Sequence, residues 1–459
     1  MSYKMKKAAY VRPDSSSGLF RYQGAVYNIP FFEEYSNNSI DISHIDFESI
    51  KEDYFYFESS QIVAFCYDIL LSIKVFGNRI EFEDSSTKII EYKEVLEKTN
   101  NILMHLIEKN AFITTRFNYH AINLIEDIYS TDEPYIVFTV YKKNFLVDKI
   151  SGISKVVIPK GLEFKGKDFV KFNKNTKKVT SRVLYNTPKD YYISIVKQAK
   201  EDIRNGEIFQ IVLSQVIKIK SDISTNQLFY KMKEKNPSEY SIVINTKDEQ
   251  IVCFSPETLI KKEKNIVKTF PIAGTYRIND GDDVGQKKIE ILKDKKEISE
   301  HVMLVDLARN DLGRISKAGT VKVEEYLQIK KLYNLIHIYS VVTGELEEKN
   351  LIKAILSVFP AGTLTGAPKV RAMQLIEKYE SQRRGLYGGA IGYIYKDSLD
   401  LAIAIRMAIK DKKENTFLLQ SGAGIVNLSI PENEYQECLT KLRAFLKIME
   451  VDENDIVNR

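Results

Sequence analysis

Residues 386–426 decide the fold class, and they read LYGGAIGYIYKDSLDLAIAIRMAIKDKKENTFLLQSGAGIV. Apolar runs rich in β-branched and aromatic residues lie at 386–396, 399–410 and 415–426, with only short polar stretches between them. This pattern predicts strands that follow one another in sequence. Strands joined by such short turns pair in an antiparallel sheet. Because a helix is expected next, from Pro431 to about Met449, the region indicates an α+β fold with helices packed outside the sheet.

The rest of the chain continues this mixture of strands and helices. We expect strands at 208–220, 241–246, 251–255, 321–329 and 335–346, and helices at 92–109, 191–207, 228–236, about 286–309 and from Pro368. The Lys-rich segment 159–178 is predicted to be a solvated connector between an N-terminal and a C-terminal part.

Composition excludes several classes of protein. The 459 residues are 44% apolar, and 67 Lys and Arg against 62 Asp and Glu leave a net charge of +5. So small and dispersed an excess does not favour nucleic acid, but it is compatible with small anionic substrates. The 3 cysteines lie far apart and form no CxxC pair, which favours neither a disulfide framework nor a zinc site. With no apolar run long enough to span a bilayer, we expect a cytoplasmic protein with no nucleic-acid or membrane partner.

Two expected helices each carry a pair of glutamates three residues apart. Glu297 and Glu300 lie in KKEISEHVMLVDLARND, and Glu434 and Glu437 lie in PENEYQECLTK. Such pairs share one helix face and are usually surface charge. Alternatively, two helices that each offer a carboxylate could hold Mg²⁺ together with water and a substrate carboxylate. The neighbouring His301 is expected to be a buried, hydrogen-bonded histidine.

Three short glycine-containing stretches are candidates for anion contacts. FPIAGTY at 270–276 is expected to form a tight turn that either closes a hairpin or presents backbone N–H groups to a small anion. QSGAGIV at 420–426 follows an expected strand and offers N–H groups in the same way. GTLTGAPK at 362–369 is not a P-loop, because no Ser or Thr follows Lys369. It is expected to be a turn that leads into a helix, with Thr363 able to contact an anion.

Three isolated polar residues leave alternatives open. Arg406 interrupts an apolar run and needs a carboxylate partner, which belongs either to the protein or to a substrate. His337 lies in the apolar run NLIHIYS, and an isolated histidine on an apolar strand is more often structural than catalytic. Glu257 follows a Ser-Pro turn, where a general acid and a helix cap are both reasonable.

In this order, several motifs together resemble the chorismate-utilising enzymes, and among them the large subunits (component I) of anthranilate synthases. They are IFQIVLSQ (208–215), FSPE (254–257), PIAGT (271–275), EHVMLVDLARNDLGR (300–314), GTLTGAPKVRAM (362–373), GLYGGAIGY (385–393) and QSGAGIV (420–426). The resemblance covers about residues 186–450. It implies large antiparallel sheets that form a sandwich with helices outside, an N-terminal domain at 1–185 and a chorismate-binding catalytic domain at 186–453.

The resemblance also implies a reaction and a site. Chorismate and ammonia would give anthranilate and pyruvate, the first committed step of tryptophan biosynthesis. Mg²⁺ would be bound by Glu300 and Glu437, supported by Glu297 and Glu434. Gln210, Glu257, His337 and Thr363 would be the catalytic residues, with Glu257 as the candidate acid and His337 in the final elimination. The expected substrate contacts are Gly274, Thr275, Tyr393, Arg406, Gly422, Ala423, Gly424 and Lys441.

Two positions favour amination without a covalent intermediate. Sister enzymes that make aminodeoxychorismate carry a lysine nucleophile where this chain has Ala273. Isochorismate and salicylate synthases carry a lysine base where this chain has Gln210. Both sister activities remain alternatives, as does a non-catalytic tryptophan-sensing protein.

Regulation and a partner follow from the same resemblance. YFYFESS (54–60) and KNPSEYS (235–241) are similar to the two parts of a tryptophan-inhibition site, with Ser59, Asn236, Pro237, Glu239, Tyr240 and Ser241 as the expected residues. Glu239 and Ser241 depart from the family's usual proline and methionine. None of the cysteine-containing stretches AFCYD, IVCFS and QECLT resembles the nucleophile of a glutamine amidotransferase. We therefore expect a separate glutaminase subunit to supply ammonia.

Overall fold

The computed structural model describes residues 19–22, 25–36, 42, 44–84, 87–91, 94–128, 131–162, 170–171, 178–277, 285, 289, 291–332, 335–452 and 454–457. The strands are β1 Leu19–Tyr22, β2 Ala25–Asn28, β3 Phe32–Ser36, β4 Tyr54–Glu58, β5 Ile62–Val75, β6 Arg79–Glu83, β7 Thr87–Glu91, β8 Ile113–Phe117, β9 Ile136–Asp148, β10 Ser154–Pro159, β11 Ser181–Asn186, β12 Gln210–Ser221, β13 Ser241–Asn245, β14 Glu249–Cys253, β15 Thr258–Glu263, β16 Ile266–Thr269, β17 Ile272–Arg277, β18 Lys322–Leu332, β19 Leu335–Glu345, β20 Gly366–Ala367, β21 Ala390–Tyr395, β22 Ser398–Ile403, β23 Met407–Asp411 and β24 Thr416–Ile425. The helices are α1 Val95–Glu108, α2 Lys189–Arg204, α3 Thr225–Lys235, α5 Lys295–Gly313, α6 Leu351–Val358, α7 Lys369–Tyr379, α8 Pro431–Ile448 and α9 Asn454–Val457, with short 3₁₀ turns η1 Phe47–Ser49, η2 Tyr119–Leu124 and η3 Gly362–Leu364.

One long antiparallel sheet runs through the described chain. Its neighbours follow the order β11, β12, β24, β23, β14, β13, β4, β5, β9, β8, β21, β22, β15, β16, β19 and β18. This arrangement confirms the α+β class. Strands before and after residue 185 are hydrogen-bonded to each other, β4 to β13 and β8 to β21. The two parts of the chain therefore share a sheet, and the domain division stays a prediction.

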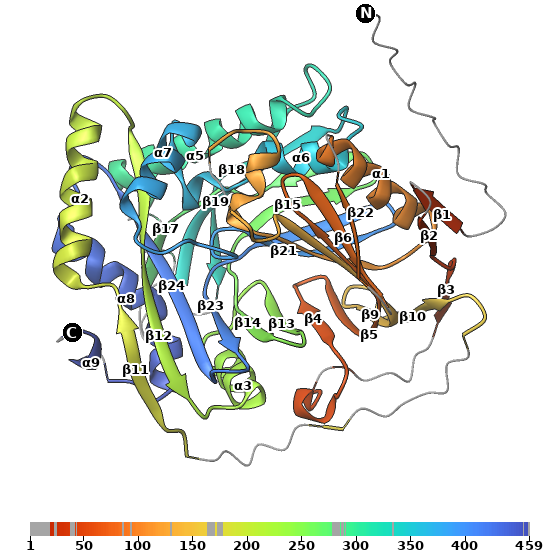
Figure 1. Ribbon diagram of the computed structural model, residues 1–459. Coiled ribbons are helices and arrows are strands. Elements are labelled where there is room, and N and C mark those ends of the chain that lie inside the picture. Colours follow the sequence, from red (N-terminus) through yellow and green to blue (C-terminus); the bar gives the residue numbers. More distant parts are fainter. Residues whose placement is uncertain are drawn as a thin grey trace, which may run out of the picture.

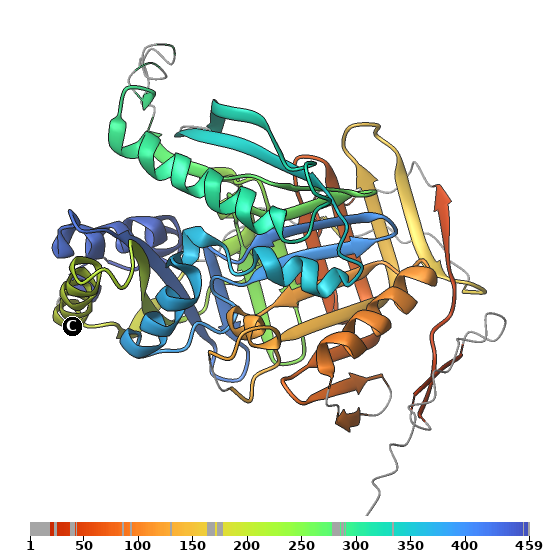
Figure 2. The same cartoon turned by 90° about the horizontal axis from the view of Figure 1, so that it is seen from above.

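The sheet folds back so that its two halves face each other (Figures 1 and 2). The ring of Phe57 in β4 lies 5.3 Å from the ring of Tyr393 in β21, although several strands separate β4 from β21 in the sheet order. Ile242, Ile391 and Leu401 are buried in the same apolar cluster. The buried layer between the halves is therefore a sandwich core of alternating inward-facing residues.

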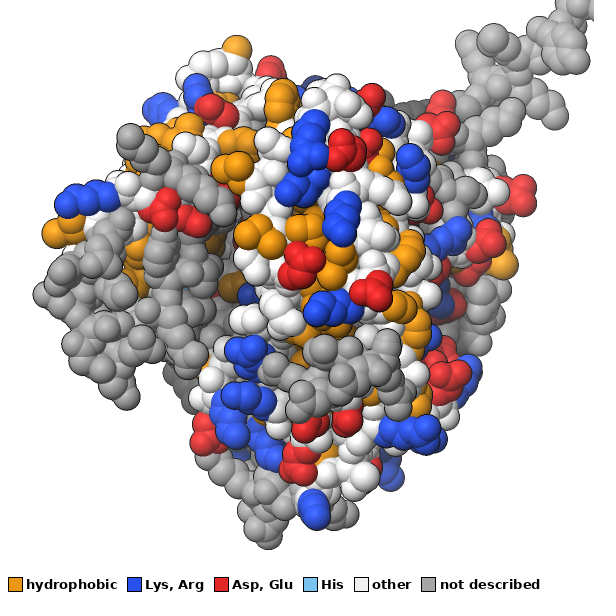
Figure 3. All heavy atoms as spheres, turned by 90° about the vertical axis from the view of Figure 1, so that its left-hand side faces the viewer, with side chains coloured by type: hydrophobic (Ala, Val, Ile, Leu, Met, Phe, Trp, Pro, Cys, Tyr) orange, Lys and Arg blue, Asp and Glu red, His pale blue; other side chains and the backbone are white. Residues whose placement is uncertain are grey.

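Helices cover the outer faces of this sandwich. Helices α2, α3, α7 and α8 pack against one another and against β12, β14 and β24, whereas α1, α5 and α6 lie against β6, β15, β17 and β19. On the face shown in Figure 3, the side chains of Lys and Arg are interspersed with those of Asp and Glu over the described residues.

Four segments differ from the expectations drawn from the sequence. The helix expected over about 286–309 is interrupted: Gly285, Ile289 and Ile291 are helical, residues 292–293 form a turn, and α5 begins at Lys295. The Asp294 side chain accepts a hydrogen bond of 3.2 Å from the backbone N–H of Glu297 and so caps α5. The run at 399–410 is split into β22 and β23 around Arg406, whose φ is +52°. FPIAGTY is not a turn, because residues 272–277 form β17. QSGAGIV lies within a strand rather than after one, because 420–425 belong to β24, which confirms the strand expected over 415–426.

Among the described residues, no helix is long and apolar enough to cross a membrane.

Candidate active site

A cavity of about 490 Å³ is lined by residues of helices α3 and α8 and of strands β17, β19 and β24. Its volume lies within the range of sites that enclose a small organic molecule. Its walls come from the end of α3 and the loop after it, the β14–β15 loop, β17, β19, η3, and the segment before β21. They also include the β22–β23 break, β24 and α8. The lining includes the predicted residues Asn236, Pro237, Glu239, Glu257, His337, Thr363, Arg406, Gly422, Gly424 and Lys441. Residues that are far apart in the sequence therefore meet around one cavity.

Arg406 places a guanidinium at this cavity. Its Nη1 donates a hydrogen bond of 3.0 Å to the backbone carbonyl of Lys441. Among the described residues, no carboxylate lies within ion-pair distance of the guanidinium. Burial lowers the pKa of Arg406, because water no longer solvates the charge. A guanidinium in this position favours an anionic ligand.

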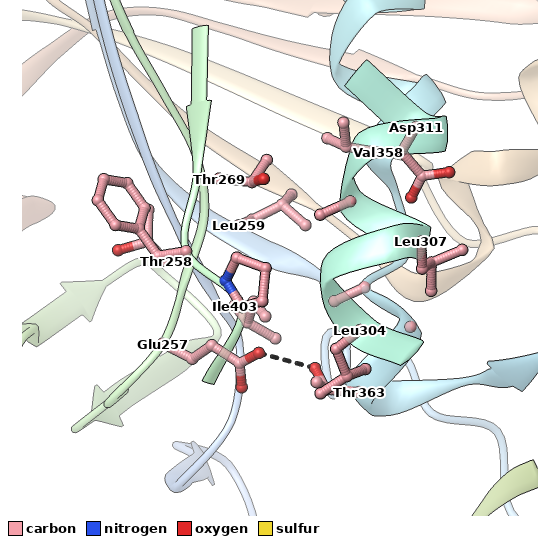
Figure 4. A pocket seen from close by; sticks show the side chains of 15 residues that line it. Glu257, Thr258, Leu259, Thr269, Leu304, Leu307, Asp311, Val358, Thr363 and Ile403 are labelled. Carbon is pink, nitrogen blue, oxygen red and sulfur yellow. Dashed lines mark hydrogen bonds between the residues drawn. The ribbon is translucent and has the colours of Figure 1, made fainter. Parts of the chain in front are cut away.

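Glu257 and Thr363 form a hydrogen-bonded pair at the cavity wall (Figure 4). The Thr363 hydroxyl donates to Oε1 of Glu257 at 2.8 Å. Burial raises the pKa of Glu257 to about 7, although the hydrogen bond from Thr363 opposes the rise. Glu257 lies in the loop before β15, so it does not cap a helix. A carboxyl group that keeps its proton up to about neutral pH is suited to act as a general acid.

The glycines of β24 give the cavity a bare backbone edge. β24 pairs with β12 along its whole length, but its pairing with β23 covers only Thr416–Leu419. Gly422 and Gly424 line the cavity, while the alternation of the strand buries Ala423 in the core on the opposite face. A Cβ at Gly422 would lie 3.0 Å from the Tyr387 hydroxyl. Lys441 Nζ donates to the Gly422 carbonyl at 2.7 Å.

Gln210 of β12 and His337 of β19 are two further predicted catalytic residues near the cavity. The Gln210 side chain covers Gly424, since a Cβ on that glycine would lie 3.0 Å from Nε2 of Gln210. His337 is buried in β19, lines the cavity and is paired through its backbone with Thr275 of β17. The register shifts between Ala273 and Thr275, which leaves Gly274 as the extra residue of a β-bulge. The side chains of residues 273–277 lie outside the described part of the structure.

The expected metal ligands lie on α5 and α8, but their side chains are not arranged as a complete metal site. Among the described residues, no group of three or more His, Cys, Asp and Glu side chains is arranged to hold a metal ion. Glu437 forms an ion pair of 2.7 Å with Lys441. The donors still suit Mg²⁺, because this ion takes oxygen ligands and is commonly held by one or two carboxylates, with water and substrate completing its shell. Glu297, Glu300 and Glu434 are each partly buried.

Tyr393 does not line the cavity. Its ring is 9% exposed and stacks on Phe112 at 5.1 Å within the sandwich core. The tyrosine that lines the cavity is Tyr387, which the sequence reasoning did not select although it belongs to the same motif. Helical and strand periodicity gave no signal for it, because it precedes β21 and lies in a turn.

A buried ion pair supports this side of the cavity. Arg384 bonds Glu380 through two nitrogens, at 2.6 and 2.9 Å. The same guanidinium donates to the backbone carbonyls of Val212 and Leu364, at 2.8 and 2.5 Å. Both of these residues line the cavity. A guanidinium with these four hydrogen bonds fixes the position of the chain segments that it joins.

The two expected parts of a tryptophan-inhibition site are adjacent. β4 pairs with β13, which places Glu58 opposite Ser241, and Ser60 donates to Glu239 at 2.6 Å. Ser59 holds the β4–β5 turn, because its hydroxyl accepts from the backbone N–H of Gln61. Tyr240 is fully buried and bonds Asp400 at 2.8 Å. His301, on α5, is buried with Nε2 2.7 Å from the Ser340 hydroxyl, as expected.

Comparison with known proteins agrees with this arrangement. The family described as chorismate binding enzyme matches residues 80–447. An anthranilate synthase component 1 from Acetivibrio thermocellus is 41% identical over 309 residues, which are 66% of this chain and 61% of that protein. One from Lactococcus lactis is 45% identical over 269 residues, which are 57% of this chain and 58% of that protein. The chain thus spans about three fifths of the length of these curated relatives.

A solved structure shows the same fold over a longer part of the chain. The crystal structure of anthranilate synthase component I from Streptococcus pneumoniae superposes with a TM-score of 0.72 at 28% identity, covering 88% of this chain and 94% of that one. The fold, the cavity with its conspicuous arginine and glycine edge, and the extent of the family match agree with one another. This chain belongs to the chorismate binding enzyme family.

Proposed function

We propose that this chain is the large subunit of an anthranilate synthase, which converts chorismate and ammonia to anthranilate and pyruvate. The observation that carries the proposal is the 490 Å³ cavity, which is faced by Arg406 and by Glu257. The guanidinium of Arg406, which has no carboxylate partner among the described residues, fits a carboxylate of a dianionic substrate. Glu257 supplies a proton close by.

The proposed reaction begins with amination of the chorismate ring. Ammonia forms a C–N bond at C2 while the C4–O bond breaks. Glu257 donates its proton to the departing hydroxyl, which leaves as water, and the new ammonium group releases one proton. The pKa of about 7 for Glu257 keeps a useful fraction of the acid form at neutral pH.

Elimination then completes the reaction. Removal of the C2 proton and cleavage of the C3–O bond leave the aromatic ring of anthranilate and release the side chain as enolpyruvate, which takes up one proton at its methylene carbon to become pyruvate. We assign His337 to this step, because it lines the cavity from β19, on the α5 side. Lys441 and the β24 glycines orient the substrate, and Gln210 covers Gly424 without acting as a base.

Magnesium is the proposed cofactor. Glu300 of α5 and Glu437 of α8 would hold it, with Glu297 and Glu434 in support. When bound, Mg²⁺ supplies positive charge that stabilises the ring carboxylate as charge develops during the reaction.

Ammonia is proposed to come from glutamine through a separate glutaminase subunit. All 3 cysteines of the chain are buried and unpaired, so none is placed as an exposed nucleophile. Buried free thiols also suit a reducing compartment, the cytoplasm. Tryptophan is the proposed feedback inhibitor, at the junction of the β4–β5 turn and the 236–241 segment.

The sister activities are less consistent with the sequence. Ala273 provides no nucleophile and Gln210 provides no base. A tryptophan sensor without activity would not require Arg406, Glu257 and Thr363 around one cavity.

The test is an assay of the purified chain with chorismate, Mg²⁺ and an ammonium salt at alkaline pH. Anthranilate fluorescence and pyruvate should rise in equal amounts, stop when EDTA removes the metal and fall when tryptophan is added. Consumption of chorismate without anthranilate would indicate a sister activity. Turnover with glutamine in place of ammonium would overturn the proposal of a separate glutaminase subunit.

A further inference from the structure

Arg384 lies behind the wall of the large cavity and is not among the residues that line it. The residue is 3% exposed. Its Nη1 donates to the backbone carbonyl of Leu364, the last residue of η3, and its Nη2 donates to the carbonyl of Val212 in β12. The same guanidinium lies 5.7 Å from the centroid of the Tyr387 ring. Because Leu364, Val212 and Tyr387 all line the cavity, one buried cation contacts three parts of its wall.

Glu380, which directly follows α7, holds this guanidinium in one orientation. Its carboxylate oxygens accept from Nη2 and Nε of Arg384 at 2.6 and 2.9 Å, and Oε1 also accepts from the backbone N–H of Ser214 at 2.7 Å. Both side chains of the ion pair are at most 5% exposed, so water and salt screen the pair little. A guanidinium is a planar fork. Once two of its nitrogens are bound to Glu380, its other N–H groups are directed at the Leu364 and Val212 carbonyls.

The bond to Leu364 concerns the acid because the same short turn carries Thr363. η3 is three residues long, and a 3₁₀ turn of this length has few hydrogen bonds of its own. Its position therefore depends on contacts from outside. Beside the bond from Arg384 to the Leu364 carbonyl, the next carbonyl, that of Thr365, accepts from the backbone N–H of Val212 at 2.8 Å. These contacts fix the peptide units next to Thr363, whose hydroxyl donates to Glu257 at 2.8 Å (Figure 4).

We infer that Arg384 is a positioning residue for the proposed general acid: its bond to the Leu364 carbonyl holds η3 so that the Thr363 hydroxyl stays directed at Glu257. The inference rests on the proposed function. Arg384 has this role without touching the substrate, since its effect passes through one peptide unit and one hydroxyl. A lysine in its place would keep the positive charge beside Glu380. It would not bridge the carboxylate and two carbonyls, because an ammonium group lacks the planar fork.

The charged groups around Glu257 act on it by a different path. The Asp, Glu, His, Lys and Arg residues that line the large cavity or the small hollow beside α5 together with Glu257 are Glu234, Lys235, Glu239, Asp311, His337, Arg406 and Lys441. Burial raises the pKa of Glu257, while the hydrogen bond from Thr363 and the charge of Lys441 lower it. Loss of the Thr363 bond should therefore raise this pKa further, with the charge of Lys441 unchanged.

The test combines two substitutions and follows the pH profile of kcat. Arg384→Lys and Thr363→Val are made singly and together, and Arg383→Lys is the matched control, because Arg383 is the neighbouring arginine and is exposed. Formation of anthranilate is measured at saturating chorismate and ammonia across the pH range of the basic limb, and the KM for chorismate is measured in parallel. If Arg384→Lys does not fold, Arg384→Met combined with Glu380→Gln replaces it, since this pair leaves no buried charge without a partner.

We expect Arg384→Lys to move the basic limb to higher pH by about half a pH unit or more, in the same direction as Thr363→Val, with the KM for chorismate within about three-fold of the wild-type value. In the double variant the limb should stay where Thr363→Val alone puts it, because the hydroxyl through which Arg384 acts is gone. Arg383→Lys should leave the limb in place.

Two results would overturn the inference. One is an unmoved limb in Arg384→Lys, even with a lower kcat, because a purely structural role lowers activity without changing the acid. The other is a double variant in which the two shifts simply add. If the wild-type chain forms no anthranilate, the proposed function fails, but the positioning of Glu257 is still tested by urea unfolding. The gain in unfolding free energy from Glu257→Gln should then begin at a higher pH in the Arg384→Lys background than in the wild type, and an identical pH dependence would remove the inference.

Discussion

Replacing Glu257 by glutamine should abolish the acid and at the same time stabilise the protein, and the stabilisation should grow with pH. The folded-state pKa of Glu257 is raised from 4.5 to about 7, so the folded protein binds this proton more tightly than the unfolded chain does. Stability from this group is therefore present at low pH and is lost as pH rises from about 4.5 to about 7. Glutamine carries no charge at any pH, and its carbonyl still accepts the hydrogen bond from Thr363.

The size of the effect follows from the two pKa values. Linkage gives a cost of ionising the buried carboxyl of about 1.4 kcal/mol at about pH 5.5 and about 3.4 kcal/mol at about pH 8.5. The gain in unfolding free energy for Glu257→Gln should thus be about 2 kcal/mol larger at the higher pH. These are upper values, because the carboxyl lines a cavity that water enters.

Urea unfolding of the wild type and the variant at the two pH values measures this difference directly. The exposed carboxyl of Glu52 provides a control, since Glu52→Gln should give the same small change at both pH values. Formation of anthranilate should fall by about 10²-fold or more in Glu257→Gln. An equal change in unfolding free energy at both pH values would refute the raised pKa, whatever the loss of activity.

Further expectations concern the neighbours of this carboxyl. Thr363→Val removes a hydrogen bond that favours the ionised form of Glu257, so the pKa of Glu257 should rise by about one unit. In the pH profile of kcat at saturating ammonia, the basic limb should therefore shift to higher pH. A limb at the same or a lower pH would contradict this. Arg406→Gln should raise the KM for chorismate about 10- to 100-fold in steady-state assays, because a charge-assisted contact is lost; an unchanged KM would place the substrate carboxylates elsewhere. Gly422→Ala should lower the unfolding free energy by about 1–3 kcal/mol, since the new Cβ would lie 2.9 Å from the Leu213 carbonyl oxygen and 3.0 Å from the Tyr387 hydroxyl. If urea unfolds this variant as it unfolds the wild type, β24 has room to move.

Local sequence signals were sufficient for most of the elements. Pro431 begins α8 and Pro368 immediately precedes α7, as expected, because a proline fits the first helical turn or the position before it. The apolar runs at 241–246 and 251–255 became β13 and β14. The order of the motifs was sufficient for the family, because each motif is a contiguous stretch whose residues can be compared one by one.

Predictions failed where distant partners decide the backbone. FPIAGTY has the proline and glycine of a turn, yet residues 272–277 form β17, because β19 provides backbone partners from Tyr339 to Leu335. The run 399–410 is mostly apolar and was expected to be one strand, yet it breaks at Arg406, where φ is positive. On either side of the break, β22 and β23 pair with different neighbours, β15 and β14. An apolar pattern indicates burial but not which strand lies beside it.

The sequence by itself determined the kinds of element, the α+β class and the set of polar residues available for chemistry, because these depend on residues that are close together in the chain. Only the tertiary structure decided which of these residues share a cavity. Glu257 and Thr363 are 106 positions apart and become a hydrogen-bonded pair, while Tyr393 packs in the core and Tyr387 reaches the cavity. The physical reason is that the raised pKa of Glu257 and the lowered pKa of Arg406 both result from burial between segments that meet only when the sheet folds over.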